Sequence, residues 1–255
     1  MFSFFKFITF NNMSTSKIIK VNATRSTNDR VKMLIKSKKI KSGDIIVAKY
    51  QYGGRGQHAN KWYSSNGKNL LCSMLYKPVD VNVDRIFCIN QLVSLAVLKT
   101  IRKFNRETCL IKWPNDILSV NKKISGILVE NSLNLNQLNY SIIGVGINVN
   151  QVYFKKLPNA TSLKKISNNN INIREVLNEL IDNYKFFFSR INELDYINEE
   201  YNKNIFGKDG CKFIINGRKE HGKIIRISNN GIVKINLDSK GIQKHDPREV
   251  KIIYD

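Results

Sequence analysis

Acidic residues are scarce in this sequence of 255 residues. It has 20 Asp and Glu against 42 Lys and Arg, which gives a net charge of +22. Such a field attracts anions, among them nucleic acids, nucleotide phosphates and acidic proteins. The lysines are scattered along the chain, so the charge alone does not establish nucleic-acid binding. Long apolar runs are also missing: none approaches the roughly 20 residues of a transmembrane helix, and we expect no membrane span.

Histidine and cysteine are scarce too, with three and four residues. The cysteines show no CxxC spacing, and each lies in or beside an apolar run: Cys72, Cys88, Cys109 and Cys211. We expect buried, reduced thiols and a cytoplasmic protein, and neither a disulfide framework nor a zinc site.

Residues 1–17 are expected to form an N-terminal extension, disordered or frayed. The stretch is rich in phenylalanine and has no acidic residue, which is compatible with organellar targeting. It lacks a clear small-residue cleavage site, however. Met13 is an alternative start, which would leave the first twelve residues as a non-native extension.

Hydrophobic periodicity predicts an α+β fold, with a mixed β-sheet and helices over residues 18–204. Apolar runs predict strands at 18–21, 45–48, 70–76, 109–113, 124–130 and 140–149. Helices are predicted after Ser26, where residues 26–29 offer N-caps, and over 84–104 and 173–191. The Asn-rich region 157–172 is expected to be a loop. Because strands and helices do not alternate regularly, a doubly wound fold is not predicted.

The pattern changes after Gly207. Short β-rich runs are separated by Asn216-Gly217, Asn230-Gly231 and the triplet 239–241, all of which favour tight hairpins. Residues 205–255 are therefore predicted to form a small C-terminal β-barrel domain.

The most informative stretch for chemistry is YQYGGRGQHANKW, residues 50–62. Its three glycines let backbone amides approach a ligand closely, and such amides form anion-binding nests. Arg55 adds a planar, forked donor that suits a carboxylate or phosphate. The stretch matches neither GxxxxGK[ST] nor GxGxxG, and taken alone it is equally compatible with a flexible surface loop.

Three further motifs follow: KWPND at 112–116, KKISGILVE at 122–130 and IGVGINV at 143–149. Glycine inside a strand often marks close approach of a ligand or of another backbone. Each motif also has a plain structural interpretation: a proline that ends a strand, a solvated lysine at a strand end, and a bulge.

Together, in this order and spacing over residues 26–150, these motifs resemble the catalytic domain of biotin–protein ligases, and residues 207–255 fit that family's C-terminal β-barrel. The resemblance implies a ligase that uses ATP to form biotinyl-AMP and then biotinylates a lysine of a biotin carboxyl carrier domain. It implies Lys123 and Arg55 as the catalytic residues. The implied biotin contacts are Ser26, Thr27, Asn28, Gln51, Arg55, Gly56, Gln57, Lys123 and Gly126. The implied ATP contacts are Arg55, Trp62, Lys112, Asn115, Lys123 and Asn148, with Trp62 stacking on adenine.

These implied roles fit the chemistry. A biotin carboxylate and the ATP α-phosphate are both anions, and Lys123 and Arg55 would offset their repulsion. The ureido ring needs donors and acceptors when it is buried, which suits Ser, Thr, Asn and Gln. ATP would bring Mg²⁺, for which Asp116 is the candidate outer partner.

The sequence departs from the family pattern at Gln57 and Asn60, where arginine is common. We expect a less cationic lid that retains the adenylate less tightly. The stretch before Ser26 is too short for the DNA-binding domain of repressor-type members, so sequence-specific DNA binding is not expected. The protein is expected to be a monomer or a homodimer.

Two other functions stay open at this stage. A lipoate–protein ligase shares the broad fold, but residues 53–56 and 112–116 resemble the motifs of biotin ligases rather than those of lipoate ligases. A basic nucleic-acid-binding module would use the C-terminal barrel, yet that region has only Phe213 and Tyr254 as aromatics for stacking.

Overall fold

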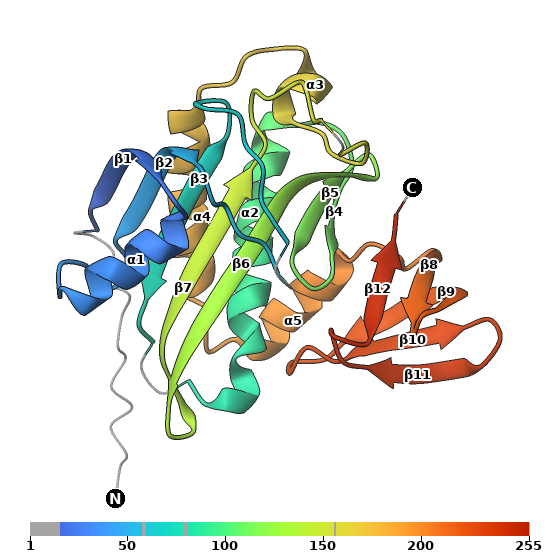
Figure 1. The fold of residues 1–255 in the computed structure, drawn as a ribbon. Coiled ribbons are helices and arrows are strands. Elements are labelled where there is room, and N and C mark those ends of the chain that lie inside the picture. Colours follow the sequence, from blue (N-terminus) through green and yellow to red (C-terminus); the bar gives the residue numbers. More distant parts are fainter. Residues whose placement is uncertain (1–15, 58–59, 79–80, 156, 255) are drawn as a thin grey trace, which may run out of the picture.

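The computed structural model describes residues 16–57, 60–78, 81–155 and 157–254, so most of the expected extension at 1–17 lies outside the described residues. A seven-stranded mixed sheet with helices lies beside a five-stranded antiparallel sheet (Figure 1). The predicted α+β fold class is confirmed.

The larger sheet contains β1 (Ile18–Thr24), β2 (Ile45–Gln51), β3 (Leu70–Tyr76), β4 (Cys109–Lys112), β5 (Asp116–Ser119), β6 (Lys122–Asn134) and β7 (Gln137–Ile147). Their order is β1-β2-β3-β7-β6-β5-β4. β1 and β2 run parallel, and the other neighbouring strands run antiparallel. β5 was not predicted, because it has four residues and follows directly on the KWPN turn.

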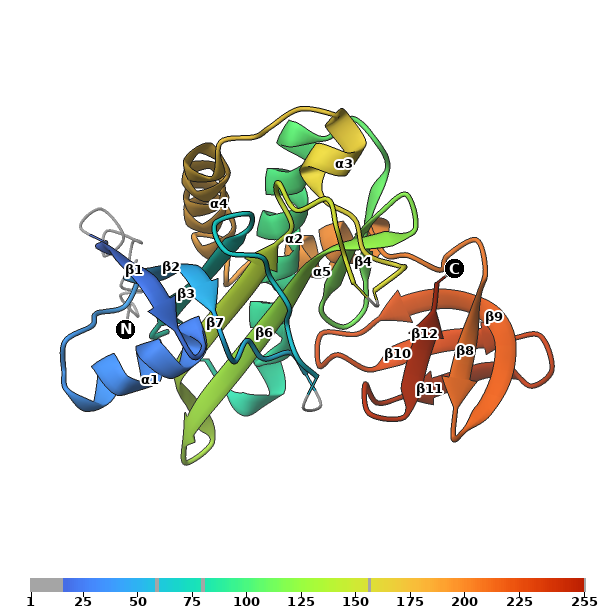
Figure 2. The ribbon, with the colours of Figure 1, turned by 45° about the horizontal axis from the view of Figure 1, so that its top comes forward.

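Helices cover the two faces of this sheet unequally (Figures 1 and 2). One face packs on α2 (Phe87–Phe104) and α4 (Ile173–Phe188), and the main hydrophobic core lies between them. The other face carries α1 (Thr27–Lys36), which contacts β2, β3 and β7 over a small apolar cluster around Val31 and Leu75.

The part of the second face that α1 leaves uncovered is formed by β6 and β7. Alternation along a strand puts Ile143, Val145 and Ile147 into the main core. Gly144 and Gly146 therefore point to the opposite face, where their missing side chains leave room above the sheet.

The C-terminal sheet contains β8 (Cys211–Ile215), β9 (Arg218–Ile227), β10 (Val233–Leu237), β11 (Gly241–His245) and β12 (Val250–Ile253), in the order β11-β10-β9-β8-β12. It curls strongly (Figure 2), and the edge strands β11 and β12 are not neighbours in it. The three expected turns join its consecutive strands, and Asn216 and Gly217 both adopt positive φ, as that hairpin requires.

Polar contacts tie the two sheets together. Trp113, after β4, donates its indole N–H to the Gly231 carbonyl at 3.1 Å. Asn202 of α5 (Leu194–Lys203) both donates to and accepts from the backbone of Ile227, at 2.9 and 2.7 Å. The C-terminal sheet is thus held against the larger one. The division into two domains at residue 204 stays a prediction.

Two helices were not predicted. The short helix α3 (Leu163–Ser167) lies in the expected loop and is capped by Ser162, whose hydroxyl accepts from Lys165 N; α5 precedes the C-terminal strands. The four cysteines are free and buried, as expected. None of the described helices is long and apolar enough to cross a membrane.

Candidate active site

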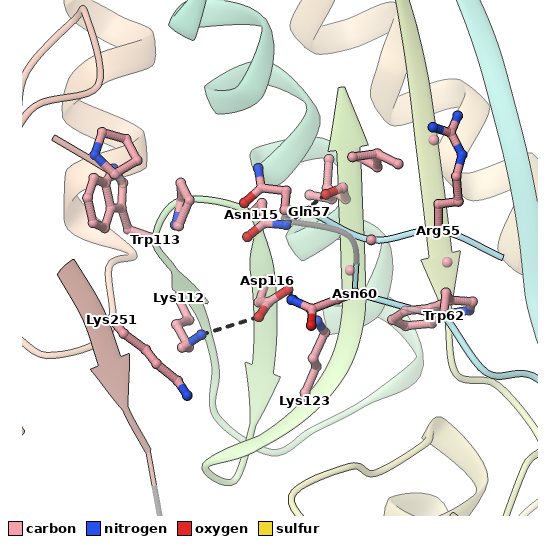
Figure 3. Close-up of a pocket in the computed structure, with 18 of the residues that line it drawn as sticks. Arg55, Gln57, Asn60, Trp62, Lys112, Trp113, Asn115, Asp116, Lys123 and Lys251 are labelled. Carbon is pink, nitrogen blue, oxygen red and sulfur yellow. Dashed lines mark hydrogen bonds and ion pairs between the residues drawn. The ribbon is translucent and has the colours of Figure 1, made fainter. Parts of the chain in front are cut away.

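A cavity of about 710 Å³ lies over the uncovered glycines of β6 and β7 (Figure 3). Its walls come from both sheets: the start of α1, residues 55–57 and 60–62, the KWPND turn, β6 and β7 on one side, and β12 with its preceding loop on the other. A volume of this size suits a cofactor-sized ligand.

A group of uncharged side chains forms the α1 side of the cavity. Thr27 donates to Gln51 Oε1 from its backbone N–H at 2.6 Å and from its hydroxyl at 3.0 Å. The Ser73 hydroxyl is 2.6 Å from Thr27 Oγ1 and 2.5 Å from Asn28 Oδ1. Together with the buried Ser26, these residues are here named the polar group. The bonds among Thr27, Gln51, Ser73 and Asn28 hold these four side chains in place before any ligand binds.

Arg55 lies at the rim of the cavity between two carboxylates. Its Nη2 is 2.8 Å from Asp29 and 2.9 Å from Glu130. Burial raises the pKa of Glu130, but hydrogen bonds from Lys32 and Asn28 and the charge of Arg55 outweigh burial, so the pKa lies below its ordinary value. Arg55 is therefore positioned by carboxyl groups of α1 and β6.

The glycine-rich segment folds back on itself beside Arg55. Trp62 N donates to the Gly54 carbonyl at 2.9 Å, and Gly56 N donates to the Asn60 carbonyl at 2.7 Å. A Cβ at Gly54 would lie 2.5 Å from the Trp62 carbonyl, so the close approach of the two strands requires glycine. The described part of the segment is thus an ordered hairpin rather than an open loop.

The Trp62 indole lies directly against the glycines of the sheet. A Cβ at Gly146 would lie 2.5 Å from Trp62 Cε2, and one at Gly126 would lie 2.8 Å from Cζ3. Lys123 Nζ is 5.6 Å from the ring centroid, within the range of a cation–π interaction. Trp62 thus forms an aromatic floor next to Lys123.

Lysines gather on the opposite side of the cavity, around one carboxylate (Figure 3). Asp116 lies 2.6 Å from Lys123 Nζ and 3.3 Å from Lys112 Nζ. Lys251 reaches toward them from β12. Burial lowers the pKa of Lys112; Asp116 opposes this, whereas the charges of Lys123 and Lys251 lower it further, and the net shift is downward. We name these four residues the cationic group; its excess positive charge suits an anion.

The KWPND motif positions this group. Asn115 Nδ2 donates to the Ile127 carbonyl, and Ile127 N donates back to the Asn115 carbonyl, both at 2.9 Å. This pair of bonds fixes the turn between β4 and β5 against β6, so Lys112 and Asp116 face Lys123.

The structure brings nearly all the sequence-predicted site residues to one cavity. Those that line it are Ser26, Thr27, Asn28, Gln51, Arg55, Gly56, Gln57, Trp62, Lys112, Asn115, Asp116, Lys123 and Gly126. Asn148 is not among the lining residues: it is buried at the end of β7, and its amide donates to the Thr161 carbonyl at 2.9 Å. Its nucleotide contact stays a prediction.

Sequence reasoning missed two contributors, Ser73 and Lys251. Ser73 lies within an apolar strand, and its only signal was a hydroxyl amid fully buried residues. At Gly144, where the sequence predicted a close approach, the Asn28 amide occupies the space of a Cβ. Lys251 comes from β12, and nothing in its local sequence connects it with Lys112.

Comparisons with known proteins indicate the family of the chain. The family model described as the biotin/lipoate A/B protein ligase family matches residues 21–148. The biotin–[acetyl-CoA-carboxylase] ligase of Mycobacterium tuberculosis is 34% identical over 125 residues, 48% of this chain and 45% of that protein. The bifunctional ligase/repressor BirA of Escherichia coli is 33% identical over 110 residues, 43% of this chain and 34% of that protein. The chain thus matches a third to under half the length of these curated relatives.

Solved structures extend the likeness to the whole fold. The biotin protein ligase from Aquifex aeolicus in complex with biotin and ATP aligns with a TM-score of 0.79 at 24% identity, covering 94% of this chain and 99% of that one. The Leishmania major enzyme in complex with biotinyl-5-AMP aligns with a TM-score of 0.63 at 19% identity, covering 90% and 98%. At these identities the likeness concerns the fold, including the C-terminal sheet.

Proposed function

The chain belongs to the biotin/lipoate A/B protein ligase family, and from this premise we propose that it is an ATP-dependent biotin–protein ligase. In this proposal it forms biotinyl-5′-AMP and transfers the biotin to a lysine of a biotin carboxyl carrier domain. The observation that carries the proposal is the pairing, in one cavity, of an uncharged polar group and a cationic group.

The polar group suits the ureido ring of biotin, which is neutral and presents both donors and acceptors. Gln51 uses its side-chain oxygen for Thr27, and its amide nitrogen makes no hydrogen bond with the described residues. That nitrogen is left to donate to a ligand carbonyl. Burying the ring beside such partners avoids the cost of unpaired polar atoms.

The cationic group suits the first chemical step. The biotin carboxylate attacks the α-phosphorus of ATP, a new carbon–oxygen–phosphorus linkage forms, and the bond to the β-phosphate breaks as pyrophosphate leaves. Both reactants and the leaving group are anions. Lys123, with Lys112 beside it, would stabilise the charge that develops at the α-phosphate, and Arg55 would do so at the carboxylate end. Trp62 offers a surface on which the adenine ring stacks.

The second step needs no covalent intermediate on the protein. The ε-amine of the acceptor lysine attacks the acyl carbon of the adenylate, AMP leaves with the bonding electron pair, and the amine loses a proton. The four cysteines are buried and do not line the cavity, which supports direct attack.

Mg²⁺ is expected to arrive with ATP, bound through the phosphates. Among the described residues no group of three or more His, Cys, Asp or Glu could hold a metal ion. Asp116 is the candidate carboxylate, but Lys112 and Lys123 already engage its two oxygens. We therefore assign no step to the metal.

The remaining sequence-based expectations extend this proposal. Gln57 and Asn60 line the cavity, and we propose that without arginines there the protein retains its adenylate less tightly. The cytoplasmic location and the choice between monomer and homodimer stay predictions.

The test is ATP–pyrophosphate exchange with biotin, with lipoate and with neither. We expect exchange that depends on biotin and that falls by about 10²- to 10³-fold in Lys123→Ala, because a group that stabilises the transition state is lost. Lys122→Ala is the matched control: Lys122 is adjacent and exposed, and does not line the cavity.

Each alternative result has a definite meaning. Exchange with lipoate alone would assign the chain to the lipoate branch of the family. Absence of exchange with both acids would contradict the proposed activity. Equal losses in Lys123→Ala and Lys122→Ala would contradict the role of Lys123.

A further inference from the structure

A second hollow, of about 500 Å³, opens beside Arg55 on the α1 side. We name it the rim hollow; the lining residues that matter here are Arg25, Asp29, Arg30, Met33, Tyr52 and Arg55. Arg55 also lines the main cavity, so the two hollows are neighbours that share one side chain.

The rim hollow carries positive charge that its surroundings do not neutralise. Three arginines line it with one aspartate, and Glu130 pairs only with Arg55 among these arginines, at 2.9 Å. Asp29 is already shared, at 2.8 Å from Arg55 and 4.0 Å from Arg25. Arg30 makes no ion pair with the described residues, and its Nε is buried without a hydrogen-bond partner. An arginine left without a partner beside an open hollow is suited to bind a carboxylate from outside.

Large apolar side chains are exposed at the same place. Tyr52 is 69% exposed and Met33 is 56% exposed. Tyrosine, methionine and arginine are the residue types that protein–protein interfaces favour over the rest of the surface. Their concentration around one hollow indicates a protein partner rather than a small anion alone.

The position of the hollow indicates which protein. A lysine that enters the main cavity has a stem of only four carbons, so its backbone must come close to the cavity mouth. Because Arg55 separates the cavity from the rim hollow, a domain that delivers such a lysine would also meet residues on the outer side of Arg55.

We propose that the rim hollow is a docking surface for the acceptor domain, where Arg25 and Arg30 bind a carboxylate that lies near the acceptor lysine. Tyr52 and Met33 pack against the apolar surface next to that carboxylate. The inference rests on the proposed ligase function and adds the feature by which the acceptor is recognised, an acidic side chain near the modified lysine.

The experiment measures the two half-reactions separately in Arg30→Glu and Arg25→Glu. The acceptor is the biotin carboxyl carrier domain of an acetyl-CoA carboxylase. We expect the KM for this domain to rise on the order of 10-fold in each variant, with kcat nearly unchanged, because charge reversal opposes docking and leaves the cavity intact. Biotin-dependent ATP–pyrophosphate exchange should stay at the parent rate.

Arg174→Glu is the matched control. Arg174 is exposed on α4, on the other face of the large sheet, and lines neither hollow. Arg174→Glu changes the net charge by the same amount as the other two variants. An equal rise of KM in all three variants would show that the effect comes from long-range electrostatic attraction, and it would overturn the proposal. Unchanged KM in Arg25→Glu and Arg30→Glu would also overturn it.

Two further measurements complete the test. An acceptor with its acidic residue near the lysine changed to lysine should recover part of the rate with Arg30→Glu; no recovery with any such change would contradict direct pairing. Sedimentation of each variant reveals whether the hollow joins two copies of this chain, and a loss of dimer without a change in KM would overturn acceptor docking. Absence of exchange in the parent protein would instead show that the proposed function had failed.

Discussion

The two sides of the cavity differ in how completely their polar and charged side chains are paired within the protein. In the polar group, Thr27 binds Gln51, Asn28 binds Glu130, and Ser73 contacts both Thr27 and Asn28. In the cationic group, Lys112 and Lys123 share the carboxylate of Asp116, and Lys251 adds a third positive charge beside them. The polar side is largely hydrogen-bonded within the free protein, whereas the cationic side has an excess of positive charge.

The difference indicates what each side is built for. Hydrogen bonds within the polar group hold its donors and acceptors in one arrangement, which lowers the entropy cost of binding a neutral ring. Excess charge in the cationic group costs stability in the free protein and is offset when an anion binds. We therefore expect substitutions on the polar side to affect affinity, and substitutions on the cationic side to affect stability as well.

Asp116→Asn should have the largest effect, because it removes the carboxylate that Lys112 and Lys123 share. Asp116 is 6% exposed. Leaving two partly buried lysines without a counter-charge should lower the free energy of unfolding by about 3 kcal/mol. Urea unfolding measures this, and added pyrophosphate should stabilise the variant more than the parent.

Asp29→Asn provides the contrast on the polar side. In this variant Glu130 still pairs with Arg55, so the free energy of unfolding should fall by less than about 1 kcal/mol. Equal losses in the two variants, or an Asp116→Asn variant within about 0.5 kcal/mol of the parent, would contradict the proposed difference in charge balance.

Gly144→Ala should have the next largest effect, and it acts on the polar side of the cavity. The new Cβ would overlap Asn28 Oδ1 and push Asn28 away from Ser73 and Glu130. If displacing Asn28 weakens biotin binding by about 1–3 kcal/mol, the size of a typical overpacking cost, the biotin affinity should fall by about 5- to 150-fold. Titration calorimetry with biotin and with ATP measures the two affinities separately, and ATP affinity should change little.

Gly146→Ala sharpens the same comparison, since its Cβ would meet the Trp62 indole instead of Asn28. ATP affinity should then fall more than biotin affinity. If both alanine variants weakened both ligands equally, the assignment of the two sides to two ligands would be wrong.

The sequence predicted most of the fold, because the buried strands are apolar runs and α2 and α4 carry regular apolar stripes. It also predicted that the glycines of β7 mark a close approach. Periodicity tells which face of a strand a residue occupies, but not which element packs there. The structure shows that Trp62 lies against Gly126 and Gly146, and Asn28 against Gly144.

Contacts between distant segments account for what was missed. Ser73 was hidden in an apolar strand, although a hydroxyl there needs a polar partner, which α1 supplies. The short helix α5 is placed by Ile197 and Tyr201, which lie in the main core, and by Asn198 and Asn202, which bind the Ile227 backbone. The approach of Lys251 to Lys112 depends on how the C-terminal sheet docks.

Lys251→Met should have the smallest effect, and it tests whether the C-terminal sheet belongs to the cationic group. The charge of Lys251 is one cause that lowers the pKa of Lys112. Removing it should raise that pKa toward the ordinary lysine value. If exchange requires protonated Lys112, activity is lost as pH rises through this pKa, so the alkaline limb of the pH–rate profile should move upward by less than about one unit.

Lys244→Met, on the exposed edge strand β11, is the control and should leave the alkaline limb in place. A lower rate at every pH with an unmoved limb would mean that Lys251 contacts the anion without acting on Lys112.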